Sequence, residues 1–123
     1  MAKTAISRAR FSKLCLALPE VAEEVIGTHS AFSVRGKKFA YFLDDHHGDD
    51  RVSIQCKAPP GENAALCRSD PVRYYMPPYM AHRGWVGVYF DAGPIDWPEV
   101  GELVTEAYLL TAPKRLAAEV VAR

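Results

Sequence analysis

One stretch of the sequence, residues 74–85, has the side chains of a binding site for an anion. Arg83 stands ahead of an alternating segment, where a guanidinium group can hold a carboxylate or a phosphate with two hydrogen bonds. His82 adds an imidazole, and the tyrosines of the stretch offer stacking surfaces to a ligand or an exposed base. The residues that we expect to contact a ligand are Tyr75, Tyr79, His82, Arg83 and Trp85.

The same stretch also suits a purely structural role. Arg83 would then pair with an acid such as Asp91 or with a helix C-terminus, and the aromatic side chains would fill the space between a sheet and the loop. The sequence leaves both interpretations open.

A second candidate site is the basic run at residues 35–38. Gly36 interrupts three cations there and lets the backbone come close to a ligand. Cations at the tip of a two-stranded ribbon can reach phosphates, so we predict nucleic-acid contacts at this tip. The residues expected to make them are Arg35, Lys37 and Lys38, together with Arg83. The alternative is a solvated turn whose charges keep the protein soluble.

Neither a metal site nor a catalytic site is expected. The acidic turn at residues 44–50 contains two histidines, but its spacing matches neither an EF-hand loop nor a two-histidine zinc motif. The cysteines Cys15, Cys56 and Cys67 fall on predicted apolar faces, where a thiol is unreactive. We therefore expect a protein that is not an enzyme and that uses no metal and no cofactor.

Composition bounds the class of protein. The chain has 123 residues, 49% hydrophobic and 24% charged, which fits a single domain over residues 1–123. Fifteen basic and fifteen acidic side chains cancel, so any grip on nucleic acid would come from local patches. Three scattered cysteines indicate a reducing compartment, and no apolar run approaches the roughly 18 residues of a membrane span. We expect a cytoplasmic protein without membrane contact.

Periodicity predicts which elements hold these stretches. A first helix is predicted with Thr4 as its N-cap and Pro19 at its end. Its inner stripe is Phe11, Leu14, Cys15 and Leu18. A ragged strand is expected from about Glu23, although one more helical turn also fits there.

Alternating polarity then predicts a hairpin and two further strands. The hairpin joins residues 31–34 to residues 38–43, with Phe39, Tyr41 and Leu43 on a single face. Residues 51–57 form a half-buried strand, with one dry side and one wet side. The dry side is Val52, Ile54 and Cys56, and the wet side is Arg51, Ser53, Gln55 and Lys57. A last strand at residues 85–90 turns Val86, Val88 and Phe90 to one face.

Three further helices complete the predicted pattern. The first spans residues 62–68 and packs through Ala65 and Leu66, ahead of a brief strand at residues 72–75. The second starts at a capping box formed by Asp96 and Glu99 and runs to about Leu110. Its inner positions are Val100, Leu103, Val104 and Ala107, and a last helix packs through Leu116, Ala117 and Val120. The fold class is α+β, an antiparallel β-sheet with helices packed on one face.

Five segments in this order resemble the MmcQ/YjbR family. They are LPEV at residues 18–21, FSVRGKKFAYF at 32–42, RVSIQCK at 51–57, GWVGVYFD at 84–91 and YLLTAPKRLA at 108–117. The resemblance implies a compact α+β fold similar to the bacterial frataxin homologue CyaY, and a double-wing role in DNA binding. At residues 79–85 this chain has YMAHRGW, where other members carry a more basic segment.

Two functional hypotheses follow from the sequence. The first is a non-enzymatic, cytoplasmic binding protein that contacts DNA weakly and without sequence preference through the basic hairpin. The second is a module that binds a small anionic ligand or a protein partner through the loop from Tyr74 to Trp85, with no nucleic acid involved.

Overall fold

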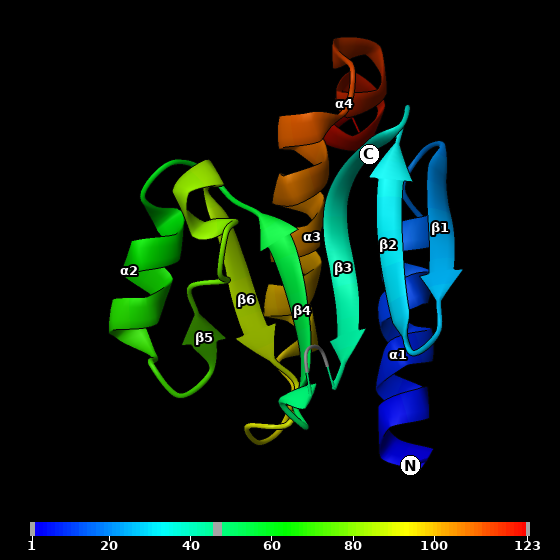
Figure 1. Ribbon diagram of the computed structural model, residues 1–123. Coiled ribbons are helices and arrows are strands. Elements are labelled where there is room, and N and C mark those ends of the chain that lie inside the picture. Colours follow the sequence, from blue (N-terminus) through cyan, green and yellow to red (C-terminus); the bar gives the residue numbers. More distant parts are fainter. Residues whose placement is uncertain (1, 46–47, 123) are drawn as a thin grey trace.

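The computed structural model describes residues 2–45 and 48–122 as four α-helices, a short 3-10 helix and six strands (Figure 1). The elements are, in order, α1 (Ala2–Leu16), β1 (Val21–Ile26), β2 (His29–Val34), β3 (Lys37–Asp44), β4 (Val52–Lys57), α2 (Glu62–Ser69), β5 (Tyr74–Tyr75), η2 (Ala81–Arg83), β6 (Trp85–Tyr89), α3 (Trp97–Thr111) and α4 (Lys114–Val121).

All six strands form one antiparallel sheet, in the order β1-β2-β3-β4-β6-β5. Short connections between strands that follow one another in the chain favour this arrangement. Helices α1 and α3 lie together behind the sheet, and α2 lies beside β5 and β6 (Figure 1). The predicted α+β class, with an antiparallel sheet and helices packed on one face, is confirmed.

The core fills the space between the sheet and the helices α1 and α3. Phe11 of α1 packs edge-on against Phe32 of β2, with ring centroids 5.5 Å apart. Val104 of α3 is 1% exposed, and Ile54 and Val86 of the central strands are fully buried. Burial of each such side chain stabilises the fold by about 1.5–3 kcal/mol. The inner stripes predicted for the first helix, for α3 and for the last strand all contribute to this core.

A bulge in β3 overturns the predicted face of that strand. Phe32 pairs with Ala40 and Ser33 pairs with Lys38, so Phe39 has no partner across the hairpin. The extra residue shifts the alternation by one position. Phe39 and Phe42 consequently belong to the core, whereas Tyr41 and Leu43 lie on the other face of the sheet.

The side of β4 that was predicted to be wet is covered. Ser53 and Gln55 are only 4% and 8% exposed. The hydroxyl of Tyr75 lies 2.8 Å from Ser53 Oγ and accepts a hydrogen bond of 3.1 Å from Gln55 Nε2. A tyrosine from the edge strand β5 therefore satisfies polar groups that alternation alone assigned to water.

The helix starts and helix contacts predicted from the sequence agree with the structure in part. The side chain of Asp96 accepts a hydrogen bond from the Glu99 N–H at 3.2 Å, as its predicted N-cap role requires. The predicted cap at Thr4 is wrong, because α1 already begins at Ala2. In α2 the predicted contact residue Ala65 is exposed. Its place is taken by Asn63, whose Nδ2 donates to the carbonyls of Ala81 and Trp85 at 2.9 Å and 3.0 Å.

Candidate functional site

A tight turn places two lysines at one end of the sheet. The turn between β2 and β3 consists of Arg35 at φ 50° and Gly36 at φ 79°. Positive φ at both central residues is the conformation that matches the twist of a two-residue hairpin. Lys37 and Lys38 follow at once, opposite Val34 and Ser33, and their side chains are exposed.

A second turn brings Arg83 to the same end. The helix η2 carries Arg83 at its last position, and Gly84 follows at φ 91°. A Cβ on Gly84 would lie 2.9 Å from the carbonyl oxygen of Ala58, just beyond β4. Only glycine combines this φ with such a close approach. Gly84 therefore allows the turn that carries Arg83 to pack closely against the end of β4.

These turns border a groove at the point where β3 and β4 separate. The last paired residues at this end are Ala40 and Cys56, and beyond them β4 leads away towards α2 (Figure 1). The groove has a volume of about 520 Å³. Its lining residues are Gly36, Lys37, Lys38, Tyr41, Lys57, Met80, Arg83, Trp85, Leu110 and Thr111. We call it the basic groove.

The charge of the basic groove is of one sign. Four cations line it and no carboxylate does; the cations are Lys37, Lys38, Lys57 and Arg83. Within the part of the chain that the structure describes, none of these four side chains forms an ion pair. Lys57 also lines a neighbouring hollow together with glutamates of α2 and α3. An anion in the groove would therefore meet Lys37, Lys38 and Arg83 as uncompensated charges.

Aromatic rings form the inner wall of the basic groove. The ring of Tyr41 lies 5.5 Å from that of Trp85, centroid to centroid, at an angle of 37°. Burial raises the pKa of the Tyr41 hydroxyl, and the positive charge of Arg83 partly offsets this increase. The hydroxyl is therefore protonated at neutral pH and is available as a hydrogen-bond donor near Arg83.

One cation and one aromatic residue of this site were not singled out from the sequence. Lys57 was predicted only as a solvent-facing residue of its strand, and Tyr41 was assigned to the face of Phe39. The register of the sheet places Lys57 opposite Trp85 and Tyr41 opposite Gln55. These pairings join residues 14 and 28 positions apart in the chain, and the local sequence pattern does not contain such information.

Arg35 is separated from the other predicted cations. Its Nε donates to Glu20 Oε1 at 2.6 Å, and a second nitrogen donates to Glu20 Oε2 at 3.1 Å. Glu20 also pairs with Arg115 of α4 at 3.5 Å. This carboxylate holds the hairpin tip beside the segment after α1 and compensates the charge of Arg35.

The structural role considered for residues 74–85, in which Arg83 pairs with an acid and the aromatic side chains fill space, agrees with the structure only in part. Asp91 pairs with Arg51, at 2.9 Å from Arg51 Nη2 to Asp91 Oδ1, and not with Arg83. Tyr75 does have a structural role, since its ring lies directly on Gly87 and stacks on Tyr89 with centroids 4.5 Å apart.

Like Tyr75, the predicted ligand contacts Tyr79 and His82 do not line the groove. Both side chains are exposed, and Tyr79 immediately precedes the groove residue Met80. The structure thus brings Lys37, Lys38, Arg83 and Trp85 together and leaves Arg35, Tyr75, Tyr79 and His82 outside.

Basic residues of α1 serve other contacts. Arg8 donates to the carbonyls of Thr28 and His29 at 2.9 Å and 3.0 Å, at the opposite end of β2. The guanidinium carbon of Arg10 lies 4.6 Å from the ring centroid of Trp97. These cations therefore support the fold far from the basic groove.

The remaining chemical groups do not form a site among the described residues. No group of three histidine, cysteine, aspartate or glutamate side chains there could hold a metal ion; His46 and His47 lie outside the described residues. Burial raises the pKa of Cys15 and raises that of Cys56 to about 12. Both thiols stay protonated at neutral pH and are poor nucleophiles.

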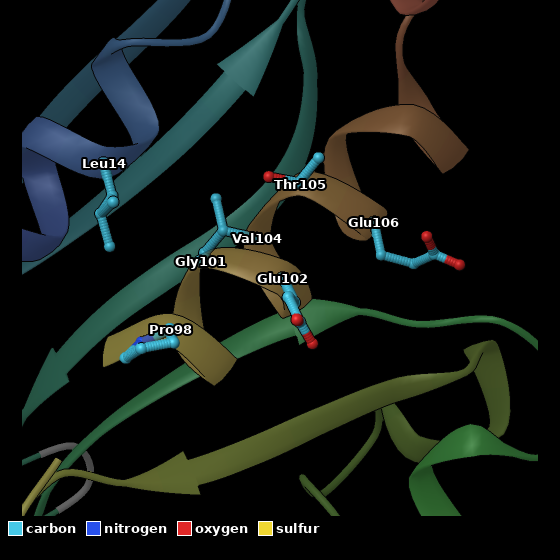
Figure 2. Close-up of a pocket in the computed structure, with 7 residues that line it drawn as sticks. All are labelled: Leu14, Pro98, Gly101, Glu102, Val104, Thr105 and Glu106. Carbon is cyan, nitrogen blue, oxygen red and sulfur yellow. The ribbon is translucent and has the colours of Figure 1, made fainter. Parts of the chain in front are cut away.

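A larger hollow of about 600 Å³ lies between α1 and α3 (Figure 2). It is bordered by Leu14 and by one side of α3. The carboxylates of Glu102 and Glu106 point away from Leu14 (Figure 2). Polar groups do not converge in this hollow, so the basic groove is the stronger candidate.

The family model described as YjbR matches residues 16–110. The chain belongs to the YjbR family. The fold is similar to that in the crystal structure of protein DR2400 from Deinococcus radiodurans, whose domain is described as DUF419. That similarity has a TM-score of 0.64 and 22% sequence identity, and it covers 80% of this chain and 72% of the other. No curated protein matches the sequence. Within the described residues, no helix has both the length and the apolar character needed to cross a membrane.

Proposed function

We propose that this YjbR-family protein is a non-enzymatic, cytoplasmic binding protein that holds the phosphate backbone of nucleic acid in the basic groove. One observation carries the proposal: Lys37, Lys38 and Arg83 come from segments far apart in the chain and meet around one groove without a compensating carboxylate. Like charges brought together in this way repel one another, and an anionic ligand removes that cost. Phosphate contacts of this kind position a nucleic acid without selecting its sequence.

The test is a fluorescence-anisotropy titration of labelled oligonucleotides across a salt series. The slope of log affinity against log salt is negative, and each lost phosphate contact reduces its magnitude by about 0.7–0.9. We expect Lys37→Ala, Lys38→Ala and Arg83→Ala each to weaken binding and to reduce the slope. The matched control is Lys13→Ala, which removes the same charge from an exposed position of α1.

The outcome that contradicts the proposal is equally direct. If no oligonucleotide binds at low salt, or if the three groove variants keep the affinity and the slope of the Lys13→Ala control, the groove does not hold phosphates.

The volume of the groove also supports a second candidate function, the binding of a small anionic ligand. Its volume of about 520 Å³ lies in the range typical of small-molecule pockets, about 300–1,000 Å³. Pyrophosphate serves as the probe. A rise in melting temperature with pyrophosphate that Arg83→Ala abolishes, in a protein that binds no oligonucleotide, would favour this candidate.

A further inference from the structure

The helix-free face of the sheet continues from the basic groove as an aromatic surface. Residues directly opposite each other on antiparallel strands share a face. By this rule Tyr41, Trp85, Tyr75 and Tyr89 all point to the side of the sheet away from α1 and α3. The half-buried rings are those of Tyr41, Tyr75 and Tyr89. Tyr41 belongs both to this surface and to the groove.

The far end of this surface also carries a cation. The guanidinium carbon of Arg51 lies 3.6 Å from the ring centroid of Tyr89, which in turn stacks on Tyr75. Asp91 compensates the charge of Arg51, so a strand of nucleic acid that leaves the groove along the sheet would pass aromatic rings without a further free cation. Phosphate contacts with aromatic side chains beside them are typical of surfaces that bind unpaired bases.

Tyr79, the residue before Met80 of the groove, adds an exposed ring. Its side chain is 88% exposed, and its backbone has φ 68°, a conformation that non-glycine residues adopt at a cost. Packing of its own side chain does not offset this cost. Its neighbour Met80, whose N–H donates to the Pro77 carbonyl at 3.2 Å, lines the groove. A ligand that stacks on Tyr79 would give the exposed ring a role.

The hairpin tip is poorly suited to a DNA duplex. A wing that enters a duplex groove needs protruding, uncompensated cations. Here the outermost cation, Arg35, is held by Glu20, whose carboxylate would face an approaching phosphate. The uncompensated cations lie in a concavity instead. A flexible single strand can enter such a concavity more readily than a stiff duplex.

We propose that the nucleic acid is an unpaired strand, with its phosphates at Lys37, Lys38 and Arg83 and its bases stacked on Tyr79 and Tyr41. This inference rests on the proposed function, because it specifies the ligand of the same groove. Three phosphate contacts to a single strand give a salt slope of about −2. Both DNA and RNA strands provide this chemistry.

The experiment compares four labelled probes by fluorescence anisotropy at low salt. They are oligo(dT) and oligo(rU) of 12 nucleotides, and 12-base-pair DNA and RNA duplexes. We expect at least one single strand to bind more tightly than its duplex. Tyr79→Ala should weaken single-strand binding about 5- to 100-fold with an unchanged salt slope, because stacking releases no counterions.

Two controls separate stacking from a structural effect. Tyr79→Phe keeps the ring and should keep the affinity for the single strand. Val72→Ala truncates another exposed side chain, 69% exposed, outside the groove and should have no effect. Circular dichroism checks that each variant is folded.

The outcomes distinguish this inference from the proposed function. Duplex binding as tight as single-strand binding, or an unchanged affinity in Tyr79→Ala, overturns the inference and leaves phosphate binding by the groove intact. Failure of all four probes to bind overturns both.

Discussion

The electrostatic effect of Arg83 on the Tyr41 hydroxyl is a measurable property of the basic groove. Burial raises the pKa of the Tyr41 hydroxyl, and the charge of Arg83 lowers it. Replacing the cation removes only the lowering effect. In Arg83→Ala we therefore expect the pKa of Tyr41 to rise further, and this can be followed by NMR titration of ¹³C-labelled tyrosine.

The control for this titration keeps the charge. Arg83→Lys should leave the pKa of Tyr41 closer to its value in the unmodified protein than Arg83→Ala does. An unchanged pKa in Arg83→Ala would mean that the two side chains do not meet in solution, and the groove would then lack one of its three uncompensated cations.

At the scale of the element, the edge strand β5 depends on a glycine in β6. The ring of Tyr75 lies directly on Gly87, and a Cβ there would overlap the ring. Gly87→Ala should lower the free energy of unfolding by about 1–3 kcal/mol, as other overpacking substitutions do. Urea denaturation measures this loss.

Gly101 in α3 is the matched control, because a Cβ there meets nothing within 4 Å. Gly101→Ala should raise the free energy of unfolding by about 0.5–1 kcal/mol, since alanine favours the helix. Equal effects of the two substitutions would contradict the packing of Tyr75 on Gly87.

The same elements explain how far the sequence predicts the fold. Local alternation suffices for the meander, and the 3.6-residue period suffices for the inner stripes, since each depends on residues close in the chain. The bulge at Phe39 escapes prediction because it is defined only by the partner strand. The burial of Ser53 and Gln55 could not be predicted from the local pattern, because Tyr75, about 20 residues away in the chain, covers them.

The candidate site follows the same rule. Lys37, Lys38 and Arg83 stand out in the sequence as cations in turns, and glycines at positions 36 and 84 indicate where the backbone must bend. Their convergence depends on the order of strands in the sheet, which the local pattern does not specify. The pairing of Arg35 with Glu20 likewise joins segments 15 residues apart.

At the scale of the whole molecule, a net charge of zero conceals a separation of charge. Cations gather in the basic groove, whereas Glu99, Glu102 and Glu106 gather on α3 and border the neighbouring hollow with Glu62. The cations of the basic groove therefore lie at one end of the sheet, where the proposed function places the anion. It also explains how a chain without overall positive charge can present a local phosphate site.

The stability of the fold at acidic pH depends on Asp91, which links the end of β6 to the start of β4. Asp91, just after β6, accepts hydrogen bonds from the Arg51 guanidinium and, at 2.8 Å, from the Val52 N–H at the start of β4. Partial burial raises the pKa of Asp91, but these hydrogen bonds outweigh it and lower the pKa below its ordinary value. The ionised form therefore stabilises the folded state.

A group with a lowered folded pKa stabilises the protein above its unfolded pKa and loses that effect as the pH falls through the folded value. Asp91→Asn should therefore be less stable than the unmodified protein at pH 7, and the difference should shrink below about pH 4. Urea denaturation at pH 7 and pH 3 measures both values. The control Glu102→Gln neutralises an exposed carboxylate that has no ion pair within the described residues, and it should change stability little at either pH. A difference between Asp91→Asn and the unmodified protein that is the same at both pH values would show that the carboxylate's charge does not hold β4 to β6.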